Sequence, residues 1–282
     1  MTDVHITASP VALAAPADAP VVVLIHGAMD RSASFGRSAR LLADLPVIRY
    51  DRRGYGHSTD LGVGDLDLHV ADVVTVLARR PAILVGHSIG GVIALAAAQR
   101  EPALVMSIGA WEAPMPWAPW WPKSSAGGAA LGAVPQTGTA GSPGSDLSEA
   151  QAGDAAERFM RKMIGDDRWG RLPPGTRAAR RAEGRALVAD VGSLRRETAP
   201  YDATALAQPV VAGCGSESVP YHRRAATELA ATVVRAELMV VEGASHGAHL
   251  SHPRDFAGFV RRAAALGGVE SVDQASTGRT SH

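Results

Sequence analysis

The sequence predicts an α/β protein: a mostly parallel, doubly wound sheet of about eight strands, with a helical cap inserted between the later strands. Two observations support this prediction. Short apolar runs rich in valine and isoleucine recur along the 282 residues, and most are continuous rather than alternating, as expected of strands covered on both faces. Segments with helical spacing separate several of these runs, and strands that alternate with helices favour a parallel sheet.

The predicted elements follow from these two patterns. The apolar runs place strands at 21–27, 46–51, 82–86, 104–111, 209–214 and 236–243. Helical spacing or an alanine-rich composition places helices at 68–79, 89–100 and 222–233.

The alternation of strands and helices stops between about Pro114 and Ala207. Residues 113–145 are dense in proline, glycine and serine and are expected to form a long loop, and two helical stretches follow at 147–164 and 175–191. A long irregular segment inside a compact domain is usually a lid or an insertion. The expected organisation is therefore a core of residues 1–113 and 208–266, a cap of residues 114–207 and a disordered polar tail of residues 267–282.

Composition excludes several classes of protein. The formal net charge is zero, so nothing indicates binding to nucleic acid or to an anionic membrane. Cys214 is the only cysteine, which rules out an internal disulfide. No run approaches the roughly 20 apolar residues that span a bilayer, and the first residues do not resemble a secretory signal. The expectation is a cytoplasmic monomer or homodimer whose partner is a small-molecule substrate.

The stretch "GHSIG" (86–90) is the first candidate site. It matches the pattern G-x-S-x-G and lies between an expected strand and an expected helix. A sharp turn there would present the Ser88 hydroxyl, while the helix N-terminus favours negative charge beside it. Gly86 and Gly90 are expected because the turn brings neighbouring backbones too close for a Cβ atom. Ser88 is therefore the predicted nucleophile.

A serine nucleophile needs a base, and His246 is the predicted one. It lies in a Gly/Ser-containing loop after the last expected strand, at the sheet end that also carries the nucleophile turn. His249 and His252 are expected to be loop or pocket-wall residues, and His87 is expected to point away from the site. No metal or other cofactor is expected, because no HExxH motif or cysteine ligand accompanies these histidines.

Four stretches, taken together, resemble the α/β-hydrolase superfamily in its order along the chain: "HGAMD" (26–30), "YDRRGYGHS" (50–58), "GHSIGG" (86–91) and "GASHGAHLSHP" (243–253). The resemblance implies a nucleophile elbow at Ser88 and a histidine loop at His246. It also implies an oxyanion hole formed by the backbone N–H groups of Ala28 and Ile89.

The third catalytic residue departs from the family pattern. The resemblance places an aspartate shortly after the strand at 209–214, where this chain has serine. Glu217 and Glu112 can each substitute, since either could accept the hydrogen bond that orients an imidazole. Glu112 is favoured because residues at strand ends are held more rigidly than loop residues. Asp51 is expected to be structural.

These features predict a serine hydrolase that cleaves a carboxylic ester, lactone or thioester of a small apolar substrate through an acyl-serine intermediate. Trp111, Trp117, Trp120 and Trp121 are expected at the cap entrance, either as lid core or as ligand contacts. Two enzymatic alternatives keep the fold, namely a C–C bond hydrolase and a cofactor-free perhydrolase. A third alternative is a non-catalytic small-molecule receptor.

Overall fold

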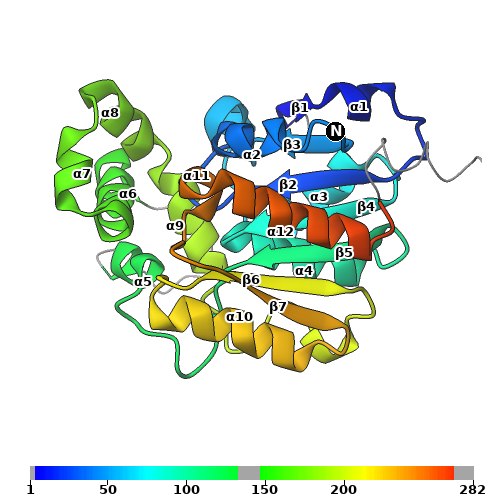
Figure 1. Ribbon diagram of the computed structural model, residues 1–282. Coiled ribbons are helices and arrows are strands. Elements are labelled where there is room, and N and C mark those ends of the chain that lie inside the picture. Colours follow the sequence, from blue (N-terminus) through cyan, green and yellow to red (C-terminus); the bar gives the residue numbers. More distant parts are fainter. Residues whose placement is uncertain (1–3, 133–146, 270–282) are drawn as a thin grey trace, which may run out of the picture.

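The computed structural model describes residues 4–132 and 147–269, which contain one mixed sheet of seven strands (Figure 1). The strands are β1 (Ile6–Ala8), β2 (Val21–Ile25), β3 (Val47–Tyr50), β4 (Ala82–His87), β5 (Val105–Trp111), β6 (Val210–Gly215) and β7 (Ala236–Val241). Their order is β1-β3-β2-β4-β5-β6-β7, and every pair is parallel except β1 with β3. The fold class is as predicted. The strand count in the described residues is seven rather than about eight.

Helices connect and cover these strands. They are α1 (Pro10–Ala14), α2 (Gly36–Arg40), α3 (Leu66–Leu77), α4 (Ile89–Arg100), α5 (Ala126–Leu131), α6 (Glu149–Ile164), α7 (Asp166–Arg171), α8 (Pro174–Ala182), α9 (Gly184–Ser193), α10 (Pro220–Thr232), α11 (Ala248–Ser251) and α12 (Pro253–Leu266). Three short 3₁₀ turns are η1 (Ser32–Phe35), η2 (Gly56–Leu61) and η3 (Ala203–Ala205). The three helices predicted in the core correspond to α3, α4 and α10, and their ends lie within two residues of the predicted ones.

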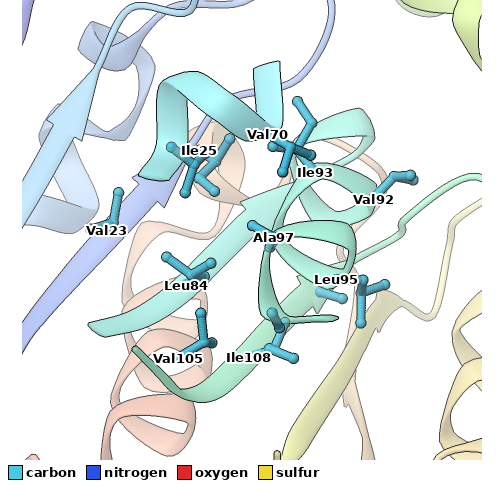
Figure 2. Close-up of a cluster of buried hydrophobic side chains, with 14 of the residues drawn as sticks. Val23, Ile25, Val70, Leu84, Val92, Ile93, Leu95, Ala97, Val105 and Ile108 are labelled. Carbon is cyan, nitrogen blue, oxygen red and sulfur yellow. The ribbon is translucent and has the colours of Figure 1, made fainter. Parts of the chain in front are cut away.

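Two hydrophobic layers bury both faces of the sheet. On β2, Val21, Val23 and Ile25 belong to a cluster shared with α3 and α4, whereas Val22 and Leu24 belong to a cluster shared with α12. Figure 2 shows α4 lying over β4 and β5 with its apolar side chains between helix and sheet. Successive side chains of a strand point to opposite faces, so burial of both faces accounts for the unbroken apolar runs.

Helices α5 to α9 follow β5 and precede β6, and in Figure 1 they gather at one end of the sheet. Two details differ from the predictions. The expected loop at 113–145 contains α5, whose first turn is capped by Ser125 accepting a hydrogen bond from the Gly128 amide; residues 133–146 lie outside the described part. The expected helix at 175–191 is instead divided into α8 and α9. The chain turns at Glu183, whose buried carboxylate accepts hydrogen bonds from Arg31 and from the Gly56 amide of the sheet domain.

A buried ion pair joins this helical segment to the sheet domain. Asp190 of α9 accepts two hydrogen bonds from the Arg52 guanidinium, at 3.0 and 2.7 Å, and both side chains are fully buried. Tyr55 donates its hydroxyl to the same carboxylate at 2.6 Å, and His69 Nε2 lies 2.8 Å from it. Breaking a buried pair of this kind typically costs about 3–5 kcal/mol because a charge is left uncompensated. This pair fixes α9 against the end of the sheet, where the predicted site residues lie.

The C-terminal part of the chain was expected to be a disordered tail from residue 267. Gly267 to Val269 continue from α12, and Val269 is buried against the α12 layer of the core. Residues 270–282, the rest of that predicted tail, lie outside the described residues. None of the described helices combines the length and apolar character needed to cross a membrane.

Candidate active site

Ser88 lies in a strained turn between β4 and α4. Its backbone has φ 56° and ψ −127°, a conformation that L-residues rarely adopt. A Cβ atom on Gly86 would lie 2.0 Å from the Gly90 carbonyl oxygen, and one on Gly90 would lie 2.2 Å from the Ile25 carbonyl oxygen. Both glycines are therefore required by the close approach of β4, α4 and β2, as the sequence predicted.

His246 and Glu112 form a hydrogen-bonded pair, with His246 Nδ1 2.7 Å from Glu112 Oε2. Glu112 directly follows β5, has a positive φ of 45° and is fully buried. Its other oxygen, Oε1, accepts hydrogen bonds from the Gly215 amide and the Ser218 hydroxyl. Of the two glutamates considered from the sequence, the folded chain thus places Glu112 beside His246, and Glu217 is exposed.

The charge state of Glu112 follows from these contacts. Burial alone would raise the pKa of this carboxyl group. The hydrogen bond from His246, the charge of that ring and the hydrogen bond from the Gly215 amide outweigh burial, and they hold the pKa of Glu112 below its ordinary value. Glu112 is therefore a carboxylate at neutral pH, and its negative charge lies against the imidazole of His246.

The backbone and the ring of His246 are both held in place. Its carbonyl oxygen accepts hydrogen bonds from Trp111 Nε1 at 3.1 Å and from His87 Nε2 at 2.9 Å. The imidazole of His222 stacks on that of His246, with ring centroids 4.4 Å apart and an angle of 29° between the planes. Burial lowers the pKa of His222 to about 3, and the charge of His246 acts in the same direction, so His222 stacks as a neutral ring. The sequence analysis missed His222, which lies in the first turn of α10.

A cavity of about 400 Å³ brings the predicted site residues together. Ser88, His246, Ala28 and Ile89 all line it. Within the described part of the chain, the amides of Ala28 and Ile89 donate to no backbone carbonyl, so both N–H groups are available to a ligand. Within the described residues no hydrogen bond joins Ser88 to His246, whose ring is bonded to Glu112. Such hydrogen bonds are often long in ligand-free enzymes and shorten when substrate binds.

Most other residues around the cavity are apolar. They come from the segment after β5, from the helices that follow it and from α10: Pro114, Pro116, Trp121, Pro122, Ala126, Leu131, Phe159, Met163, Val191, Leu194 and Tyr221. Lys123 and Arg195 are the cationic residues of the lining. This surface suits a small molecule with an apolar portion and leaves two positive charges to meet an anionic one.

Four further residues considered from the sequence, two tryptophans, His249 and Asp51, differ in their position relative to the cavity. Trp121 lines the cavity, but Trp111 does not lie at the cap entrance; it is buried in β5 against Phe256 and Phe259, because its inward position faces the α12 layer. His249 is not a pocket wall. It is 2% exposed and lies beneath the cavity lining, in α11. Asp51 accepts hydrogen bonds from the Ser32 and His57 amides, consistent with a structural role.

Two curated relatives match about a third of the chain. A 2-(acetamidomethylene)succinate hydrolase of Mesorhizobium japonicum is 36% identical over 94 residues, which are 32% of this chain and 34% of the relative. A pimeloyl-(acyl-carrier protein) methyl ester esterase of Aliivibrio fischeri is 38% identical over 88 residues, which are 31% of this chain and 34% of the relative. The chain thus matches about a third of the length of each of these two relatives.

Solved structures match nearly the whole chain at lower sequence identity. The structure of an E-2-(acetamidomethylene)succinate hydrolase has a TM-score of 0.62 and 23% identity, and the match covers 92% of this chain and 94% of that one. The enol-lactonase from Burkholderia xenovorans has a TM-score of 0.65 and 19% identity, with 93% and 96% coverage. At these identities the likeness concerns the fold.

The sequence profile of the alpha/beta hydrolase family matches residues 22–259. This range begins in β2 and ends in α12, so it includes the turn at Ser88, the end of β5 and the loop of His246. The profile covers well over half of the chain. The chain belongs to the alpha/beta hydrolase family.

Proposed function

We propose that the protein is a serine hydrolase that cleaves a carboxylic ester, lactone or thioester of a small substrate through an acyl-enzyme on Ser88. One observation carries the proposal. The imidazole of His246 is bonded through Nδ1 to a buried carboxylate, and the same ring lines a cavity with a serine held in a strained turn. Nucleophilic acyl transfer requires a hydroxyl nucleophile, a base that takes its proton and an acid that orients the base.

The proposed reaction has two stages. His246 Nε2 takes the proton of Ser88 as Oγ attacks the substrate carbonyl carbon, and the carbonyl oxygen becomes an oxyanion. The amides of Ala28 and Ile89 donate hydrogen bonds to that oxygen, and one such donor typically contributes about 2.7–4 kcal/mol. His246 then protonates the departing alkoxide or thiolate. In the second stage His246 activates a water molecule, which releases the acid and regenerates Ser88.

Glu112 has a defined part in this scheme. Its Oε2 accepts the Nδ1 proton of His246, which leaves the Nε2 lone pair free to receive the proton of Ser88. When His246 becomes an imidazolium, the carboxylate stabilises the new positive charge. Because Oε1 is already saturated by Gly215 and Ser218, Glu112 cannot turn away from His246 without losing two hydrogen bonds.

Replacing the nucleophile tests the proposal. Ser88→Ala is expected to lower kcat for p-nitrophenyl acetate by at least about 10⁴-fold, because no acyl-enzyme can form. The exposed Ser251 provides a matched control, and Ser251→Ala should leave kcat unchanged. A fluorophosphonate probe should label the native chain on Ser88 and should not label Ser88→Ala. Ester turnover retained by folded Ser88→Ala would reject the serine mechanism. A native chain that neither reacts with the probe nor turns over the ester would favour a non-catalytic receptor.

A second candidate is hydrolysis of a carbon–nitrogen acyl bond in a substrate that carries carboxylates. Lys123 and Arg195 in the cavity lining favour it, as does the similarity to a relative named for the hydrolysis of 2-(acetamidomethylene)succinate. A paired assay separates the two candidates: kcat/KM is measured for a neutral ester and for an N-acyl enamine dicarboxylate. A higher kcat/KM for the dicarboxylate favours the second candidate, and no turnover of it favours the first.

A further inference from the structure

We propose that Asp30, His87 and His249 form a binding site for a divalent transition metal, best suited to Zn²⁺, behind the nucleophile turn. No sequence pattern predicts this site, because the three residues are far apart in the chain and match no metal motif. They do not line the substrate cavity described above. The inference therefore does not depend on the proposed function.

The donor atoms have the separations that a metal needs. Asp30 Oδ2 lies 3.2 Å from His249 Nε2 and 3.9 Å from His87 Nδ1, and the three donor atoms all lie within 4.8 Å of one another. Nitrogen and oxygen ligands of tetrahedral zinc bind at about 2.0–2.2 Å, which places neighbouring ligand atoms roughly 3.3–3.5 Å apart. Small side-chain rotations would bring the set to this spacing. Two imidazoles and one carboxylate leave a fourth position open.

His87 is already oriented as a ligand. Its Nε2 donates to the His246 carbonyl oxygen, so the proton is on Nε2 and the lone pair is on Nδ1, facing Asp30. That Nδ1 has no hydrogen-bond partner, although His87 is only 6% exposed. A metal binds the lone pair of a neutral imidazole, and the hydrogen bond at Nε2 leaves that lone pair on Nδ1. A hydrogen bond on the opposite ring nitrogen is typical of histidines that ligate metals.

His249 and Asp30 complete the set. Within the described residues, Nδ1 of His249 has no partner, and Nε2 is within ion-pair distance of Asp30 without the geometry of a hydrogen bond; the residue is 2% exposed. Buried nitrogens without a partner are costly, and a metal bound at Nε2 would satisfy one of them. Asp30 supplies the negative charge; the side chain of Ser34 also donates to its Oδ2, at 3.0 Å. The Asp30 side chain is 17% exposed, which leaves a path from solvent to the site.

The three ligands come from the segments that carry the oxyanion donor Ala28, the nucleophile Ser88 and the base His246. Asp30 lies two residues after Ala28, His87 directly precedes Ser88, and His249 lies three residues after His246. A metal held by all three would tether the oxyanion donor, the nucleophile turn and the histidine loop to one another. It would stabilise the folded chain over the unfolded one, in which no such site exists.

A direct binding experiment tests the proposal on the tag-free chain after removal of metals with a chelator. Calorimetric titration with Zn²⁺ should give one saturable equivalent, and the melting temperature should rise with Zn²⁺ concentration. Titration with Co²⁺ should give the visible absorption of a tetrahedral site. Asp30→Asn and His249→Gln should each weaken Zn²⁺ binding by at least 100-fold, and His252→Gln should leave it unchanged.

A second cluster makes the test decisive. Glu112, His222 and His246 also place one donor atom each within 4.8 Å of one another, so zinc bound there would be held by the proposed catalytic residues. His222→Gln should leave the Zn²⁺ affinity intact if the site is the one proposed. Loss of binding in His222→Gln with retention in Asp30→Asn would overturn the proposal, as would the absence of saturable binding by the native chain. If His249→Gln does not fold by circular dichroism, Asp30→Asn decides the outcome.

Discussion

Two clusters of one carboxylate and two histidines flank the turn at Ser88, and they differ in how their hydrogen bonds are completed. In the first, Glu112, His222 and His246, the carboxylate is fully buried and both of its oxygens accept hydrogen bonds. In the second, Asp30, His87 and His249, three buried ring nitrogens make no hydrogen bond within the described residues, whereas the first has one such nitrogen, His222 Nδ1. Clusters of the same composition can therefore serve different chemistry. The first cluster holds the imidazole of His246 in one orientation, and the second leaves ring nitrogens available to a metal ion, as proposed above.

The two clusters also differ in whether their residues line the cavity. His222 and His246 line it, whereas none of the members of the second cluster does. His87 connects the two, since its ring centroid is 4.6 Å from that of His246 and its Nε2 donates to the His246 carbonyl. The comparison predicts that changes in the first cluster affect the chemical step most, and that changes in the second affect it much less.

The largest expected effect comes from Glu112→Gln. The Gly215 amide and the Ser218 hydroxyl both donate to Oε1, so the glutamine carbonyl oxygen will occupy that position. The side-chain NH₂ group will then face His246 Nδ1 and donate to it. This forces the proton of His246 onto Nε2, where it can no longer accept the proton of Ser88, and kcat for p-nitrophenyl acetate should fall by about 10⁴-fold.

Two variants serve as comparisons for this measurement. Glu217→Gln alters an exposed glutamate just after the neighbouring strand β6 and should leave kcat unchanged. Asp30→Asn, in the second cluster, should lower kcat by far less than Glu112→Gln, because Asp30 does not contact His246. A loss of similar size in Asp30→Asn and Glu112→Gln, with both variants folded, would mean that the two clusters do not have separate roles.

The clusters also show what the sequence could predict. Ser88 and its glycines form a local pattern between an expected strand and an expected helix, so this stretch and its context could predict a candidate nucleophile. Glu112 and Glu217 could not be separated with certainty, because the choice depends on which strand end faces the His246 loop. His249 and Asp30 are 219 residues apart, and nothing in the spacing of either indicates the other. Their meeting is a consequence of the sheet order alone.

A smaller effect is expected in the pH dependence of stability. The pKa of His222 is lowered from its ordinary value of 6.5 to about 3 in the folded chain, first by burial and then by the charge of His246. The unfolded chain therefore takes up a proton between about pH 6.5 and pH 3 that the folded chain does not, and stability falls as the pH drops through this window. His222→Phe removes this contribution, so its free energy of unfolding should fall less steeply, by up to about 1.4 kcal/mol per pH unit.

Urea denaturation at several pH values between 6 and 4 measures the slope of the free energy of unfolding against pH. His5→Asn, which alters an exposed histidine far from the site in sequence, should give the native slope. His26, whose pKa is lowered to about 4 by burial and by Arg52, contributes equally in all three chains. Equal slopes for the native chain and His222→Phe would show that the stacked imidazole of His222 is protonated at mildly acidic pH, contrary to its assigned state.

The helical segment between β5 and β6 illustrates a second limit of sequence patterns. Its existence was expected from the break in alternation after about residue 114, but the division of one expected helix into α8 and α9 was not. Helical periodicity continues across Glu183. The break there is imposed by contacts with Arg31 and Gly56, residues more than 120 positions earlier. The short edge strand β1 was missed for a related reason, because three residues are too few to show a period.

The smallest expected effect concerns Ser218, which helps to hold the acid of the first cluster. Ser218→Ala removes one of the two donors to Glu112 Oε1 and leaves the Gly215 amide as the other. A hydrogen bond to a charged group typically contributes about 1.5–3 kcal/mol, so the variant should be less stable by roughly that amount. The carboxylate gains some freedom to rotate away from His246, and kcat should fall by about tenfold with little change in KM. Thermal unfolding and ester kinetics on the same preparation measure both quantities.

A loss of kcat as large as that of Glu112→Gln would show that Ser218 acts directly in the reaction. An unchanged kcat would show that Gly215 and the backbone at Glu112 hold the carboxylate without Ser218.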